Sequence, residues 1–138
     1  MLWRHRLFYD KGYDDTLGDP SATPELLTPT TIYAPLVKHL LDEVPILGMA
    51  HITGGGIPEN LPRCLPEGIT VDIDYDSWER PEIFNVIQKA GEIEEEEMRK
   101  TFNLGIGFCL IVPPDTTVDT EVKIWGHDLR SWVIGQTK

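Results

Sequence analysis

Apolar and polar residues recur along the chain in patterns that predict helices and strands in alternation. From Leu36 to Val44 the apolar residues repeat at helical spacing, Pro35 suits a first turn, and Pro45 ends the helix. The apolar run Ile46–Thr53 is short and continuous, which favours a buried strand, and it stops at three consecutive glycines. This part of the chain therefore predicts a helix followed by a strand.

The rest of the chain continues the alternation. In a helix predicted at 94–102, Glu95 precedes Arg99 and Glu96 precedes Lys100 by four residues, a spacing that favours ion pairs on the helix surface. In order, the pattern predicts a short helix or turn at 58–65, a half-buried strand at 71–75, helices at 81–91 and 94–102, a central strand at 104–112 and a short final strand at 131–135.

This order of elements predicts an α/β (α+β) fold, in which a mixed β-sheet is layered with helices. At the start of the chain, Leu2–Tyr9 has a helical pattern, and Asp10–Pro29 is rich in Gly, Pro, Asp and Thr, as long loops are. One short helix and a long loop are an unusual beginning for a compact domain. We therefore divide the chain into residues 1–29, a helix and loop, and residues 30–138, the α/β domain.

Composition narrows the range of partners. The net charge is −11 and no block of Lys or Arg stands out, so nucleic-acid binding through a basic face is not expected. No apolar run is long enough to span a membrane and no signal peptide is evident, so a cytoplasmic location is expected.

Cys64 and Cys109 lack metal-ligand spacing, and Cys109 lies in an apolar run typical of a core. The acids Asp72, Asp74 and Asp76 are interpreted as a solvated strand face rather than a metal site.

The segment 51–56, with the sequence HITGGG, is the first candidate for binding chemistry. Glycines at a strand end let backbone N–H groups form a concave anion site, and a following helix N-terminus favours phosphate. Asn60 and Arg63 lie about one turn further on and offer more donors, the guanidinium being suited to two-point phosphate binding. A plain strand-to-helix turn is an equal alternative. At this position His51 can donate to a substrate oxygen or transfer a proton, or it can be a core histidine.

Two further segments carry weaker signals. In 101–107, with the sequence TFNLGIG, Gly105 and Gly107 lie two apart on the predicted strand. One strand face would then be bare, which admits a ligand or allows close packing. Asn103 is by itself an ordinary turn residue. The segment 27–33, LTPTTIY, precedes a helix, so its hydroxyls are expected to cap that helix rather than to contact a phosphate.

Together these segments resemble the aminoimidazole ribonucleotide synthetase family, also called phosphoribosylformylglycinamidine cyclo-ligase. The similar blocks are LLTPTTIY, MAHITGGGIPENLPRCLPEGI, the acidic run EEEEMRKTFNLGIG and the terminal WVIG, and they follow the order of the family. The resemblance implies the carboxy-terminal α/β domain of a two-domain enzyme, with the interdomain helix within residues 1–29. The amino-terminal ATP-binding domain would be absent.

The resemblance also implies a reaction and the residues that serve it. In that family, ATP phosphorylates the amide oxygen of formylglycinamidine ribonucleotide, and phosphate leaves as the imidazole ring of a purine precursor closes. His51 would be the active-site histidine, in substrate contact or proton transfer. ATP and Mg²⁺ would be held mostly by the absent domain, and no metal ligand is assigned here. The residues expected to line the substrate and phosphate are Thr53, Gly54, Gly55, Gly56, Asn60, Arg63, Asn103 and Gly105.

Two departures from the family bear on activity. The family usually has arginine where Thr31 stands, and its loss removes a charge that would meet the substrate. The stretch 115–130 is weakly patterned, so the amphipathic helix that the family shows before its last strand is expected to be missing. Both features lower the activity expected of this copy.

Three functions follow as alternatives. The first is half of the cyclo-ligase, inactive alone and completed by an amino-terminal domain in cis or in trans, with a small-molecule nucleotide as substrate and a homodimer left open. The second is a non-catalytic nucleotide-phosphate-binding domain or a truncated remnant. The third is another member of the same ATP-binding superfamily, such as formylglycinamidine ribonucleotide synthetase or selenophosphate synthetase, against which the complete HITGGGIPENLPR and FNLGIG blocks argue.

Overall fold

The computed structural model describes residues 29–138, and the helix predicted at Leu2–Tyr9 and nearly all of the loop after it lie outside these residues. The described part alternates helices and strands, as the sequence predicted. Its elements are α3 (Ala34–Glu43), β1 (Gly48–His51), α4 (Gly56–Asn60), a 3₁₀ helix (Leu61–Cys64), β2 (Val71–Ile73), α5 (Glu82–Gly91), α6 (Glu95–Thr101), β3 (Phe108–Ile111), a second 3₁₀ helix (Pro114–Thr116), α7 (Thr117–Trp125) and β4 (Gly135–Thr137).

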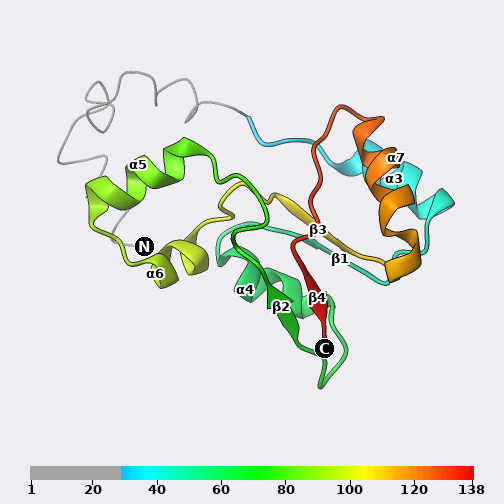
Figure 1. Cartoon of the computed structure of the whole chain (residues 1–138), viewed down its shortest axis with the longest axis horizontal. Coiled ribbons are helices and arrows are strands. Elements are labelled where there is room, and N and C mark those ends of the chain that lie inside the picture. Colours follow the sequence, from blue (N-terminus) through cyan, green and yellow to red (C-terminus); the bar gives the residue numbers. More distant parts are fainter. Residues whose placement is uncertain (1–28) are drawn as a thin grey trace.

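Within these residues the strands form two antiparallel pairs, β1 with β3 and β2 with β4. In the first pair Gly48 lies opposite Ile111 and His51 opposite Phe108. The β1–β3 ribbon runs between two groups of helices, with α5 and α6 at one end and α3 and α7 at the other (Figure 1). The α/β (α+β) class is therefore confirmed, with each sheet reduced to a single pair of strands.

Two apolar clusters hold the strand pairs and the helices together. The larger one gathers residues from both strand pairs and from α4 and α6, and Ile52, Met98 and Leu104 are almost fully buried in it. The smaller one lies at the other end, where Leu40 of α3 is fully buried and Ile124 of α7 packs against the cluster. Burial of a side chain of this size stabilises the fold by about 1.5–3 kcal/mol.

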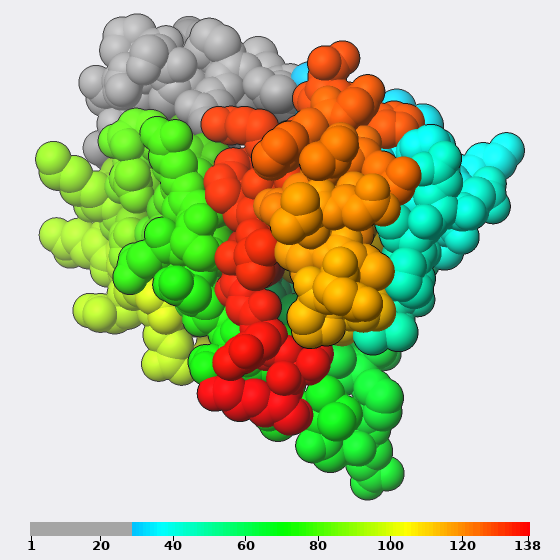
Figure 2. Space-filling model, turned by 45° about the vertical axis from the view of Figure 1, so that its right-hand side comes forward, coloured from blue at the N-terminus to red at the C-terminus, as the bar shows by residue number. Residues whose placement is uncertain are grey.

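The carboxy-terminal segment closes the larger cluster from outside. Trp132 and Ile134 pack against it, and the Ile134 carbonyl accepts a hydrogen bond from the Asp74 N–H at 2.9 Å. In Figure 2 this segment is a continuous band between α7 and the green part of the chain. The strand predicted at 131–135 is therefore shifted, because β4 pairs only from Gly135 onward.

The prediction of a strand from Leu104 to Val112 was wrong over its first half. Leu104 and Gly105 have φ angles of 51° and 101°, which strands do not adopt, and the Ile106 N–H donates back to the Asn103 carbonyl at 3.0 Å. A tight turn therefore precedes β3. Gly105 and Gly107 do not share a bare strand face.

The helix expected to be missing from the stretch 115–130 is present as α7. Its Thr120 is buried, and its Lys123 forms an ion pair with Glu43 of α3. The second of the two departures from the family is thereby removed. Within residues 29–138, no helix has the length and apolar character needed to cross a membrane.

Candidate functional site

The glycine block forms a tight turn between β1 and α4. The Gly56 N–H donates to the Thr53 carbonyl at 3.0 Å, and Gly55 and Gly56 have φ angles of 97° and 57°. This left-handed region costs little for glycine and strains any residue with a β-carbon. Consecutive glycines are therefore required by the shape of the turn itself.

The Asn60 side chain stabilises this turn through two hydrogen bonds. Its side-chain Nδ2 donates to the Gly56 carbonyl at 2.8 Å and to the Gly54 carbonyl at 3.2 Å, and the residue is only 5% exposed. A carboxamide nitrogen has two hydrogens, so both are already engaged. The structure gives Asn60 a part in shaping the turn, and the donor that we expected it to offer a phosphate is occupied.

The three glycines face different surroundings. A β-carbon on Gly56 would overlap the Arg99 carbonyl oxygen, and one on Gly55 would overlap the Glu59 carboxylate. A β-carbon on Gly54 would meet nothing within 4 Å, and this residue is exposed. Gly56 thus serves the packing of α4 against α6, and Gly54 is the glycine whose open side leaves room for a ligand.

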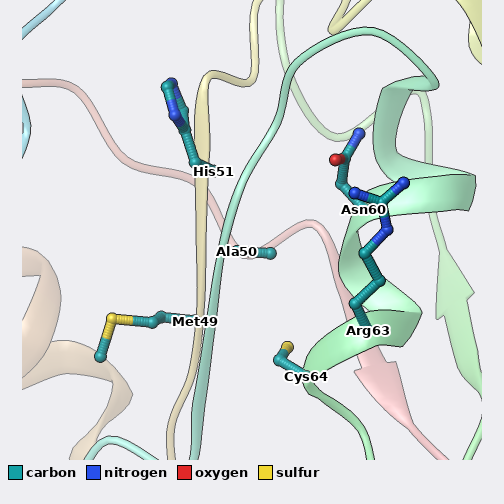
Figure 3. A pocket seen from close by; sticks show the side chains of 6 residues that line it. All are labelled: Met49, Ala50, His51, Asn60, Arg63 and Cys64. Carbon is teal, nitrogen blue, oxygen red and sulfur yellow. The ribbon is translucent and has the colours of Figure 1, made fainter.

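A shallow hollow of about 270 Å³ lies beside this turn. It is lined by Met49, Ala50, His51, Asn60, Arg63 and Cys64. In Figure 3, His51 and Met49 project from one side of β1, and Ala50 projects from the other, toward Asn60, Arg63 and Cys64. The predicted residues His51 and Arg63 therefore flank the same strand on opposite faces.

His51 is exposed and stands among aromatic rings. The ring of Tyr33 meets it edge-on, with centroids 5.8 Å apart and planes at 66°, and the ring of Phe108 lies 6.2 Å away. Tyr33 and Phe108 also contact each other, with centroids 5.2 Å apart. The sequence did not predict these neighbours of His51. The signal for Phe108 was its register opposite His51, which only the pairing of β1 with β3 defines.

The second motif reaches the site through Gly107. The Ile52 N–H donates to the Gly107 carbonyl at 2.9 Å, which joins the end of β1 to the start of β3. Asn103, half-buried, accepts a hydrogen bond on Oδ1 from the Gly105 N–H at 3.1 Å. A β-carbon on Gly105 would stand 2.6 Å from Cδ of Pro81. The contacts of Asn103 and Gly105 thus define a turn that packs against the segment before α5.

Charge at the glycine turn is mixed. The Glu59 carboxylate lies against Gly55, so an anion bound there would face a negative charge. Arg63 lines the hollow beside the turn, is exposed, and makes no ion pair with any other residue from 29 to 138. In the same part of the chain, no three His, Cys, Asp or Glu side chains lie close enough to hold a metal ion.

The two cysteines and the segment before α3 are the remaining features that the sequence analysis singled out. Cys64 and Cys109 are free thiols, and burial raises the pKa of Cys109 to about 12, which keeps it protonated. Cys64 lines the hollow and donates from Sγ to the Leu61 carbonyl at 3.1 Å. The expected capping of α3 by hydroxyls was wrong, because the N-cap position is Tyr33 and no side chain caps it. Thr31 is exposed.

Comparison with known proteins gives a consistent result. Residues 4–138 match the sequence model of a family described as "AIR synthase related protein, C-terminal domain". A phosphoribosylformylglycinamidine cyclo-ligase of Parasynechococcus marenigrum is 49% identical, over 97% of this chain and 40% of that protein. Proteins of the same name from Prochlorococcus marinus and Citrifermentans bemidjiense are 53% and 48% identical, over 82% and 91% of this chain and 33% and 36% of theirs. The chain thus spans between a third and two-fifths of the length of these relatives.

Proposed function

The chain belongs to the family of AIR synthase related proteins, whose C-terminal domain it matches over residues 4–138, and on that basis we propose that it is the carboxy-terminal part of a phosphoribosylformylglycinamidine cyclo-ligase. The reaction proposed is the ATP-dependent conversion of formylglycinamidine ribonucleotide to aminoimidazole ribonucleotide in purine biosynthesis. The observation that carries the proposal is the junction of the two motif blocks. The Ile52 N–H bonds to the Gly107 carbonyl, and Gly56 packs against the end of α6.

The site supports a division of roles among its residues. His51, exposed at the end of β1, would contact the substrate or transfer a proton, for which an imidazole is suited near neutral pH. The open side of Gly54 would let a phosphate approach the backbone. The guanidinium of Arg63 would supply a positive charge that attracts this phosphate and compensates for the nearby Glu59 carboxylate. Asn60 would act by holding the turn in shape.

The other predicted residues would act around this centre. Thr53 is exposed beside the turn, and Asn103 directly follows Phe102, whose carbonyl oxygen packs against Gly56. We propose that both border the substrate, and that Gly105 supports the border through its contact with Pro81.

ATP and Mg²⁺ would be held elsewhere in the complete enzyme. The described residues offer no metal cluster, and the relatives have more than half of their length outside the matched region. When bound, the nucleotide supplies the phosphoryl group that activates the substrate amide. We propose that an amino-terminal part, in cis or in trans, binds it, and that this chain is inactive alone, with a cytoplasmic location and a homodimer as further expectations.

A reconstituted assay tests the proposal. This chain would be mixed with a separately produced amino-terminal part of the Parasynechococcus marenigrum relative, and ring closure would be measured with ATP, Mg²⁺ and formylglycinamidine ribonucleotide. We expect product from the mixture and none from either part alone. His51→Ala should abolish most of the rate, and His39→Ala, an exposed histidine of α3, is the matched control.

Each result separates the alternatives. Product from the chain alone would contradict the proposal that its ATP site lies elsewhere. Absence of product from a mixture in which both parts are folded would favour the alternative of a non-catalytic nucleotide-phosphate-binding domain or a remnant. In that case Thr31→Arg, which restores the charge usual in the family, is the variant to examine next.

A further inference from the structure

Gly107 lacks a side chain for a reason that its own backbone does not explain. Its φ angle is not in the left-handed region, and the three atoms nearest to a β-carbon built on it all belong to Tyr33. That β-carbon would overlap the Tyr33 hydroxyl oxygen and would stand 3.0 Å from Cζ. The hydroxyl end of the Tyr33 ring therefore occupies the space that a side chain at residue 107 would need.

Tyr33 uses this space to reach His51. Phe108 and His51 are opposite partners in the β1–β3 register, so their side chains leave the same face of the strand pair. Tyr33, from the segment before α3, lies 5.2 Å from Phe108 and 5.8 Å from His51 between ring centroids. Its edge-on arrangement against the imidazole, at 66°, is one that aromatic pairs favour. Tyr33 is half-buried, so it is held more firmly than the exposed histidine.

From this geometry we propose that Tyr33 is a positioning residue for His51. The absence of a side chain at Gly107 provides the space in which the Tyr33 ring is held. The proposal rests on the proposed function, in which the His51 imidazole meets the substrate. An exposed side chain samples several rotamers, and two aromatic neighbours restrict the imidazole to one of them. A catalytic group that is held in its reactive orientation contributes more to the rate than one that must find it.

The chain itself allows a test that needs no activity. In nuclear magnetic resonance spectra of the wild-type chain, we expect Overhauser contacts between the Tyr33 and His51 rings and a single set of imidazole signals. Tyr33→Phe should keep both features, because the ring remains. Tyr33→Ala should alter the imidazole signals, and Gly107→Ala should abolish the ring contacts because it displaces Tyr33.

A matched control excludes a general effect of added methyl groups. Gly126→Ala, at the end of α7, places a β-carbon 3.3 Å from its nearest neighbour and should leave the His51 signals unchanged. Thermal unfolding of each variant shows whether it is folded, and Tyr33→Ala decides the question if Gly107→Ala fails to fold. Ring contacts that persist in Gly107→Ala, or imidazole signals unmoved in Tyr33→Ala, would overturn the proposal.

The reconstituted assay adds a functional measurement. Tyr33→Ala should lower kcat by roughly tenfold to a hundredfold with little change in KM, and Tyr33→Phe should recover the wild-type kcat. If the wild-type mixture turns over and Tyr33→Ala has an unchanged kcat, Tyr33 does not position His51. If the wild-type mixture is itself silent, the proposed function fails, and the spectra alone decide the relationship between Tyr33 and His51.

Discussion

Gly56 lies against the main-chain carbonyl oxygen of Arg99 so closely that a β-carbon at residue 56 would overlap that oxygen. The same β-carbon would stand 2.8 Å from the carbonyl oxygen of Phe102. Gly56 begins α4 and Arg99 belongs to α6, so this contact brings the start of one helix onto the last turn of another. The glycine block is thereby tied to the acidic helix that follows it by some forty residues.

This contact predicts a large loss of stability in Gly56→Ala. The new β-carbon must displace backbone rather than a flexible side chain, and alanine is strained at a φ of 57°. We expect a loss of about 2–4 kcal/mol in the free energy of unfolding. Urea unfolding followed by circular dichroism measures it. Gly54→Ala is the control, with a change of about 0.5 kcal/mol or less, and equal losses in the two variants would show that Gly56 is not packed as described.

Asn60→Asp should destabilise the turn although it changes only one group. The carboxamide nitrogen that donates to the Gly54 and Gly56 carbonyls becomes an oxygen, so buried acceptors would face each other. We expect a loss of about 2–4 kcal/mol at neutral pH, measured by urea unfolding. Asn85→Asp, on the exposed face of α5, also removes a side-chain donor, from a 2.9 Å hydrogen bond to the Glu82 carboxylate, but it does so in water and should cost about 1 kcal/mol or less. An Asn60→Asp variant as stable as this control would show that the two hydrogen bonds of the Asn60 side chain do not stabilise the turn.

Glu95 should make the fold sensitive to acid. Hydrogen bonds from Arg80, then from Arg99 and Gln88, lower the pKa of its carboxyl group to about 2, against an opposing effect of burial. Because the folded pKa is depressed, its stabilisation is present above the unfolded value of about 4.3 and is lost as the pH falls toward 2.

The wild-type chain should therefore exceed Glu95→Gln in stability at pH 7 and converge with it near pH 2. We expect a difference of about 1 kcal/mol at pH 7, reduced from the full pKa shift because the Glu95 side chain is 38% exposed and screened by solvent. Unfolding free energies measured across this range, with Glu96→Gln as an exposed ion-pair control, give the comparison. A difference that does not shrink on acidification would show that the pairing of Glu95 does not stabilise the fold.

Sequence periodicity predicted the elements whose burial follows from their own spacing. Leu36 and Leu40 are both buried, as a helix with one apolar face requires, and the pair Glu95 and Arg99 lies 2.9 Å apart as its spacing indicated. In contrast, α7 was missed because its apolar side chains point both ways. Val118 and Val122 are largely exposed while Ile124 packs inward, so no clean periodic face is visible in the sequence.

For the candidate site, the sequence named residues but could not give their arrangement. The HITGGG block identified the turn, but its spacing could not show that Asn60 turns its donors inward or that His51 and Arg63 lie on opposite faces of β1. The Tyr33 neighbour of His51 comes from a segment outside the strand pair altogether. Such contacts depend on strand register and tertiary packing, which local patterns do not contain.

The turn at Leu104 also depends on contacts that the local sequence pattern does not contain. Leu104 is buried and apolar, which suggested a strand, yet it adopts a φ of 51°. Its carbonyl accepts a hydrogen bond from the indole Nε1 of Trp78 at 2.9 Å, across twenty-six residues of sequence. Trp78→Phe keeps an aromatic ring and removes this donor, which leaves a buried carbonyl without its partner. We expect a loss of about 2–3 kcal/mol in unfolding free energy.

Trp125→Phe, at an exposed position of α7, is the matched control and should change stability by about 0.5 kcal/mol or less. If the Trp78 hydrogen bond holds the turn, hydrogen exchange should also quicken at the Gly105 N–H, which bonds to Asn103 within the same turn. Exchange at Gly105 that stays at the wild-type rate in Trp78→Phe would mean that the turn keeps its shape without the tryptophan.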